Sequence, residues 1–180
     1  MNRVQLSHVL RAAARVANNN EIVVIGSQSI LGSFDERELP LEATMSMEAD
    51  ICFLSDIDEF SSDLVDGSIG ELSSFHEAFG YYAQGVSLTT AVLPSGWQDR
   101  VVAYREGDYE PSLAVCLDPH DLVVSKLVAG RQKDVEFAKA LLDVGLVSEE
   151  LLLERAEMLD RPGSVIKRIQ STINRLKTSD

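Results

Sequence analysis

A short apolar run near the start of the chain constrains the fold more than any other feature. Residues 21–25 read EIVVI, so four β-branched residues follow one another with no polar residue between them, and the run stops at Gly26. A strand with one face in water alternates between apolar and polar residues, whereas a continuous run is typical of a strand buried on both faces. We therefore expect an α/β fold in which helices flank a small sheet.

The segments around this run carry helix and strand patterns in turn. Apolar residues at helical spacing predict a helix over residues 3–17, which the three asparagines at 18–20 end. Ser27 is expected to cap a short helix over 28–32, and the charged, proline-containing segment 34–44 is expected to be a loop. Acidic turns followed by a helical stretch are expected from 56 to 84, centred on 72–79. Strands are predicted at 48–54, 86–93, 100–104 and 113–117, with turns at 94–96 and 106–108.

From Asp118 onward the pattern is helical. Asp118 suits the N-cap position and Pro119 the first helical position, and breaks at Gly130, Gly145 and residues 161–163 divide the segment into successive helices. No flexible linker precedes it. The sequence therefore predicts a core over residues 1–117, built on a small mixed sheet, and a C-terminal helical bundle over 118–180 that packs on this core.

Two acidic residues, Glu48 and Asp50, fall on one predicted strand. Residues two apart on a strand point to the same face, about 6.6 to 7 Å apart, so both carboxylates project together. Mg²⁺ or Mn²⁺ held by these carboxylates and by phosphate oxygens would remove their mutual repulsion and the cost of their burial. Such a metal site favours in-line displacement at a phosphate. The alternative is a strand whose outer face simply shows two acids to water.

The turn at Gly26 and Ser27 follows the first buried strand. A strand that ends in Gly-Ser at the start of a helix offers backbone N–H groups and a hydroxyl for phosphate oxygens, and glycine lets the phosphate approach without a Cβ. Taken alone, the turn is an ordinary helix start. If its strand neighbours the one with Glu48 and Asp50, the turn and the acids form a phosphate site opposite a metal site.

Several motifs together resemble a known family. These motifs are IGS at 25–27, EADI at 48–51, LPSGWQDR at 93–100, DPHDLVVSKL at 118–127 and AGRQKD at 129–134. They resemble the minimal nucleotidyltransferases of the polymerase-β superfamily, above all the branch that contains DUF6036, AbiEii and MenT-type toxins, over roughly residues 20 to 145. The gap of 22 residues (48 − 26) between glycine and first acid is longer than usual in that superfamily. The resemblance therefore implies an inserted loop at 34–44.

The resemblance implies a nucleotidyltransferase sheet and the transfer of a nucleoside monophosphate from a nucleoside triphosphate to an acceptor hydroxyl. Asp50, Lys126 and Asp134 would be catalytic. Glu48 and Asp50 would hold the metal, although the family often has another residue at the first acid, which leaves direct binding by Glu48 open. The nucleotide would contact Gly26, Ser27, Ser46, Lys126 and Arg131.

Two of these residues have alternatives. A lysine ammonium beside the phosphates would offset the charge of the triphosphate and of the leaving group, but Lys126 could also be an exposed helix lysine. Asp134 could be a third carboxylate that supports the metal or the acceptor, or it could cap a helix that begins at residue 135. Trp97 and Arg100 could contact a base and a phosphate, although a lone tryptophan more often belongs to the core.

Composition limits the partners. With 16 basic and 29 acidic residues the net charge is −13, which argues against binding of duplex DNA. By analogy with the toxin relatives, the acceptor could be a tRNA 3′ end, a protein hydroxyl could replace it, and an antitoxin protein could be a partner. The competing hypothesis is a catalytically inactive interaction module with the same fold. No apolar run could cross a membrane and no signal-peptide pattern is present, so we expect a cytoplasmic protein without a membrane partner.

Overall fold

The computed structural model describes residues 1–56, 59–105 and 113–177 of the chain. A mixed sheet with the strand order β3-β2-β1-β5-β4 lies at its centre. Strand β1 pairs antiparallel with β2 and parallel with β5, while β3 is parallel to β2 and β4 is antiparallel to β5. The strands are β1 (Ile22–Val24), β2 (Glu48–Phe53), β3 (Tyr82–Gly85), β4 (Val102–Tyr104) and β5 (Ala114–Cys116). The expected α/β fold with a small mixed sheet is confirmed.

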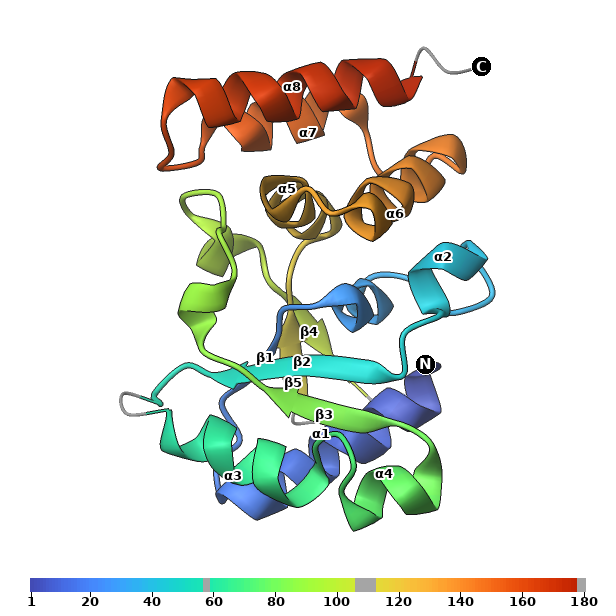
Figure 1. Cartoon of the computed structure of the whole chain (residues 1–180), viewed down its shortest axis with the longest axis vertical. Coiled ribbons are helices and arrows are strands. Elements are labelled where there is room, and N and C mark those ends of the chain that lie inside the picture. The colour runs from blue at the N-terminus through green and yellow to red at the C-terminus, as the bar shows by residue number, and fades with distance from the viewer. Residues whose placement is uncertain (57–58, 106–112, 178–180) are drawn as a thin grey trace.

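Helices α1 (Arg3–Ala17), α3 (Phe60–Ile69) and α4 (Ser74–Phe79) cover one face of this sheet (Figure 1). The helix predicted at residues 3–17 is confirmed. Asn2 caps it by accepting a hydrogen bond from the backbone N–H of Gln5, and Asn18 ends it in the left-handed conformation. All three residues of β1 are buried, as its continuous apolar run indicates.

The other face carries the short helices η1 (Ser27–Gly32) and α2 (Leu41–Thr44), and beyond them the C-terminal helices (Figure 1). The C-terminal helices are α5 (Pro119–Ala129), α6 (Gln132–Asp143), α7 (Glu149–Glu157) and α8 (Gly163–Lys177). Asp118 caps α5 by accepting from two backbone N–H groups of its first turn, and Gly130 ends α5 with a φ of 66°. Both the start and the end of this helix agree with the sequence prediction.

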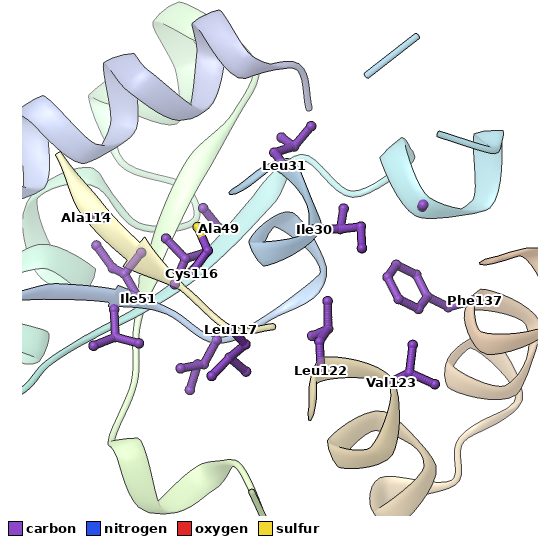
Figure 2. Packing of buried hydrophobic residues seen from close by; sticks show 14 of the residues in the cluster. Ile30, Leu31, Ala49, Ile51, Ala114, Cys116, Leu117, Leu122, Val123 and Phe137 are labelled. Carbon is purple, nitrogen blue, oxygen red and sulfur yellow. The ribbon is translucent and has the colours of Figure 1, made fainter. Parts of the chain in front are cut away.

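One apolar core runs from the sheet into the C-terminal helices. Ile30 of η1 points toward Phe137 on α6, and Leu122 of α5 lies on the same side of η1, whereas Leu31 points away from these helices, as Figure 2 shows. All four residues are at most 3% exposed. The hydrophobic effect therefore holds α5 and α6 against the sheet, at about 25 cal/mol for each Å² of apolar surface removed from water.

The predicted strand at 86–93 is wrong. The strand lies just before it, at Tyr82–Gly85, and the segment that follows contains the short helix η2 (Leu88–Thr90), which the hydroxyl of Ser87 caps. The less apolar sequence YAQG forms the strand because it packs against α3. A Cβ at Gly85 would overlap the carbonyl oxygen of Ser62 on that helix. Periodicity in the chain alone does not reveal such a contact.

Three other local predictions need correction. The acidic segment expected to form turns contains α3, whose first turn is held by backbone hydrogen bonds to the carboxylate of Asp56. The expected loop at 34–44 contains α2 at its end, and η1 begins after Gly26 without a cap from the side chain of Ser27. The strands at 48–54, 100–104 and 113–117 are confirmed with ends shifted by one or two residues. The turn at 106–108 lies outside the described residues.

No helix among the described residues is both long and apolar enough to cross a bilayer. Cys52 and Cys116 are free, buried thiols, and burial raises the pKa of each to about 12.

Candidate functional site

The Gly26 turn lies directly against the acidic strand. Because β1 and β2 are antiparallel neighbours, the N–H of Ile25 donates to the carbonyl of Asp50 at 3.0 Å. A Cβ placed on Gly26 would overlap the carboxylate of Asp50. Only glycine therefore fits at position 26 while Asp50 keeps its place, and the glycine turn and the acid meet in space although 24 positions (50 − 26) separate them in the chain.

Glu48 and Asp50 project from the same face of β2. Partial burial is the largest cause that raises the pKa of Asp50, to about 7, and the hydrogen bond and negative charge of Glu48 add to this rise. The hydroxyl of Tyr82 on β3 donates to Glu48 Oε2 at 3.1 Å, as the register between the two strands requires. The positive charge of Lys126 opposes this rise but does not cancel it, so the pKa of Asp50 stays above its ordinary value.

Lys126 reaches the Gly26 turn from the opposite side of the site. Its Nζ donates to the Oγ of Ser27 at 2.9 Å and lies 3.5 Å from Oδ1 of Asp134 and 4.8 Å from the centre of the Phe137 ring. The side chain is only 12% exposed, so the alternative of an exposed helix lysine is wrong. Burial lowers the pKa of Lys126, while Asp134 and Asp50 act against this shift.

Asp134 is paired with cations and is fully buried. Its carboxylate accepts from Nε of Arg131 at 2.7 Å and from the N–H of Arg131 at 3.3 Å, and it lies near Lys126. Burial alone would raise the pKa of Asp134, but the hydrogen bond from Arg131 and the two positive charges hold it below its ordinary value. Asp134 thus fixes the first turn of α6 and orients two cationic side chains.

The described residues contain no group of three or more His, Cys, Asp or Glu side chains that converge as metal ligands. Glu48 and Asp50 on β2 form the one pair of adjacent carboxylates predicted from the sequence to hold a cation. The third-carboxylate interpretation of Asp134 has no support in this geometry, because its oxygens face Lys126 and Arg131.

A pocket of about 370 Å³ joins these groups. Seven of the residues that the resemblance assigns to the site line it: Ser27, Ser46, Glu48, Asp50, Lys126, Arg131 and Asp134. Gly26 is in contact with Asp50 but does not line this pocket. The Oγ of Ser46 donates to the carbonyl of Glu48 and accepts from its N–H, both at 3.2 Å, so Ser46 also fixes the start of β2.

Several other residues of the site are not marked by any pattern in the sequence. Lys133 and Phe137 line the pocket from α6, and Met45 lines it from the segment before β2. Tyr82 was missed because the strand was placed four residues too late, which removed its phenol from consideration. The correct strand position, with Tyr82 opposite Glu48 in the register, would have identified it.

Trp97 and Arg100 lie away from the pocket in the short helix η3 (Trp97–Arg100). Trp97 is buried, and Arg100 makes two hydrogen bonds to the buried carboxylate of Asp121, at 2.8 and 3.1 Å. Nε of Arg155 on α7 lies 3.4 Å from the same carboxylate. These residues tie the loop after β3 to α5 and α7, so contacts of Trp97 and Arg100 with a nucleotide are not part of this arrangement.

The comparison with known families agrees with this geometry. A family model described as a nucleotidyltransferase of unknown function, DUF6036, matches residues 4–168. No curated protein and no solved structure shows significant similarity to the chain. The matched segment contains the glycine turn, the acid pair and the three cationic residues of the pocket, Lys126, Arg131 and Lys133. Because it also spans most of the sequence, the chain belongs to the DUF6036 family of nucleotidyltransferases.

Proposed function

We propose that this chain transfers a nucleoside monophosphate from a nucleoside triphosphate to an acceptor hydroxyl and releases pyrophosphate. The observation that carries the proposal is the contact of the Asp50 carboxylate with Gly26, beside Glu48 and opposite Lys126, which itself binds Ser27. An acid pair and a buried cation around one glycine turn are suited to a metal-bound triphosphate.

The residues present fit a divalent cation. The pKa of Asp50 is raised by burial and by Glu48, so a cation between the two carboxylates would relieve an interaction that the fold leaves unfavourable. Oxygen ligands of this kind suit Mg²⁺ or Mn²⁺. Glu48 and Asp50 would hold the ion, and the bound ion would neutralise charge on the phosphates. Phosphate oxygens and water would supply its other ligands.

The triphosphate would be bound by the cationic side of the pocket. Lys126 and Arg131 would place positive charge beside the phosphates, and the hydroxyls of Ser27 and Ser46 would orient them. Gly26 would keep the approach to Asp50 free of a side chain. Charge that develops on the departing pyrophosphate would be stabilised by cations already in position.

Asp134 would act through those cations. Its carboxylate holds both Lys126 and Arg131, so it keeps their charged groups at the pocket in the absence of nucleotide. We therefore assign Asp134 a positioning role. The acceptor proton would leave to a base outside this group.

The acceptor is a tRNA 3′ end or a protein hydroxyl in this proposal. A role as the toxin of a toxin–antitoxin pair, neutralised by an antitoxin protein, is proposed on the resemblance to AbiEii and MenT-type proteins alone.

Label transfer tests the proposal. The chain is incubated with each of the four α-³²P-labelled nucleoside triphosphates, Mg²⁺ or Mn²⁺, and a cell extract, and labelled macromolecules are separated on a gel. We expect transfer with at least one nucleotide and a loss of about a thousandfold in Asp50→Asn, comparable with the loss of a central electrostatic group in other enzymes. The exposed Asp160→Asn variant is the matched control and should keep full transfer.

Two results would count against the enzyme. Equal transfer by Asp50→Asn would mean that the label is not attached at this site. Absence of both transfer and any nucleotide-dependent thermal shift of the wild type, with either metal, would favour the interaction module instead.

A further inference from the structure

A second pocket meets the first at its charged centre. This acceptor pocket, of about 250 Å³, shares Asp50, Lys126 and Arg131 with the first pocket. Its remaining walls come from the end of β1, the segment around η2 and the outer turns of α5, with Gly26, Val86, Thr90, Ala91, Ser125 and Ala129 among them. Gly26 therefore lines the acceptor pocket, whereas its neighbour Ser27 lines the first pocket.

The two pockets differ in charge. Beyond the shared groups, the first pocket is lined by five more charged side chains: Glu42, Glu48, Lys133, Asp134 and Glu136. Its mixture of carboxylates and cations suits a triphosphate with its metal. The acceptor pocket adds no charged side chain of its own, only apolar walls and the hydroxyls of Thr90 and Ser125. An uncharged group that needs a close approach to Asp50 fits it better than a phosphate does.

The surface next to the acceptor pocket is acidic. A further pocket of about 280 Å³ shares Val86 with it and is lined by Asp56, Glu59 and the apolar side chains of Leu54 and Leu88. A polynucleotide whose end entered the acceptor pocket would bring phosphates toward these carboxylates, on a chain with a net charge of −13. A polypeptide with a basic or apolar residue near its hydroxyl has no such conflict.

We propose that the acceptor pocket receives a Ser, Thr or Tyr hydroxyl of a polypeptide segment that lies across η2, with a neighbouring basic or apolar side chain in the acidic pocket. The inference rests on the proposed function and selects the class of its acceptor. In the reaction the acceptor oxygen forms a bond to the α-phosphorus, and the bond from that phosphorus to the bridging oxygen of the β-phosphate breaks. Pyrophosphate leaves, and the hydroxyl proton passes to the solvent.

The test separates the acceptor from the nucleotide. Products of the label-transfer reaction are divided and treated with ribonuclease or with protease before electrophoresis. In parallel, Ala129→Trp fills the acceptor pocket from an exposed position at the end of α5, and the exposed Ala78→Trp on α4 is the matched control. Binding of α,β-methylene analogues of the nucleoside triphosphates, with Mg²⁺, is measured for each variant.

We expect label that protease removes and ribonuclease leaves. Ala129→Trp should lower transfer about tenfold or more, because small displacements of a reacting group have effects of this size. Ala129→Trp should change the affinity for the analogues by no more than about twofold. Ala78→Trp should change neither transfer nor analogue affinity by more than about twofold.

Ribonuclease-sensitive label that depends on Asp50 would overturn the protein acceptor while the proposed transferase activity stands. Equal losses of analogue binding and transfer in a folded Ala129→Trp protein would overturn the division into two pockets. Wild-type protein that binds the analogues but labels nothing would overturn the transferase itself, and the acceptor with it.

Discussion

The start of strand β2 and the hairpin of α5 and α6 contribute opposite halves of one pocket. On β2, Asp50 lies beside another carboxylate, and its pKa is raised to about 7. On the hairpin, Asp134 lies between two cations, and its pKa is lowered. The hairpin is therefore neutralised within the protein, whereas the strand is suited to an external cation. The comparison teaches that the charge of Asp134 is already balanced within the fold, whereas Asp50 is the aspartate that the proposed function assigns to the chemistry.

The largest effect should come from removing the charge of Asp134, which neutralises the cations of the α5–α6 hairpin. Asp134→Asn leaves Lys126 buried without a charged partner and removes a charged acceptor from Arg131, so we expect a loss of about 3 kcal/mol in the free energy of unfolding at pH 7. Because the folded pKa is lowered, Asp134 stabilises the protein above its ordinary pKa of 3.8, and this contribution disappears as the pH falls further.

Urea denaturation measures this loss. Asp143→Asn is the control, because Asp143 on the same helix pairs with Lys139 at an exposed position and should contribute less than about 1 kcal/mol. Equal stability of Asp134→Asn and the wild type at pH 7 would remove the contrast between the two aspartates.

The next effect concerns the lysine that joins both halves. Lys126→Met keeps an unbranched side chain of similar volume but removes the charge beside Ser27, so we expect affinity for a nucleoside triphosphate analogue to fall about a hundredfold. Isothermal titration with Mg²⁺ measures it, and Lys139→Met on the exposed face of α6 is the control. Unchanged affinity would mean that the triphosphate does not contact this lysine.

The third effect is a pH-dependent response to metal. An excess of Mg²⁺ of about a hundredfold over its dissociation constant should stabilise the protein by about 2 to 3 kcal/mol at pH 8. The increase should shrink as the pH falls through about 7, since the raised pKa of Asp50 means that this carboxylate takes up a proton there. Thermal denaturation with and without Mg²⁺ measures both values. A shift of equal size in Asp50→Asn would place the metal elsewhere.

The smallest effect concerns the phenol that supports the acid pair. Tyr82→Phe removes the donor to Glu48, and we expect Mg²⁺ binding to weaken by about 1 kcal/mol, which is roughly fivefold. Tyr81→Phe is a matched control, because its hydroxyl also makes one hydrogen bond, to Nδ1 of His8, on the opposite face of the sheet. If both variants weakened Mg²⁺ binding equally, the loss would come from a disturbance of β3 as a whole and not from the hydrogen bond to Glu48.

Much of the fold follows from local patterns in the sequence. The apolar run of β1, the amphipathic helix α1 and the cap at Asp118 each depend on neighbouring residues, and each was predicted with nearly correct ends. The prediction misplaced strand β3. This strand lies at the edge of the sheet and its position depends on its contact with α3, which the periodicity of the sequence does not reveal.

Most residues of the candidate site could be predicted from the sequence, but the contacts between them could not. Glycine followed by an acid-x-acid strand marks residues that must meet, so the acid pair and the turn were found together. The bond of Lys126 to Ser27 links positions 99 residues apart, and no local pattern encodes it. The same is true of the cations around Asp134, whose sequence context equally suited a metal ligand.

The shared apolar core of η1, α5 and α6 has a kinetic consequence. Phe137 and Leu122 pack the cationic hairpin into the same apolar core as the sheet, so a triphosphate that binds as proposed would enter by replacing ion-pair partners within a well-packed frame. Entry of this kind should slow with rising ionic strength and respond little to solvent viscosity. Under the proposed function, hydrophobic packing behind the charges would therefore influence how quickly a substrate is exchanged.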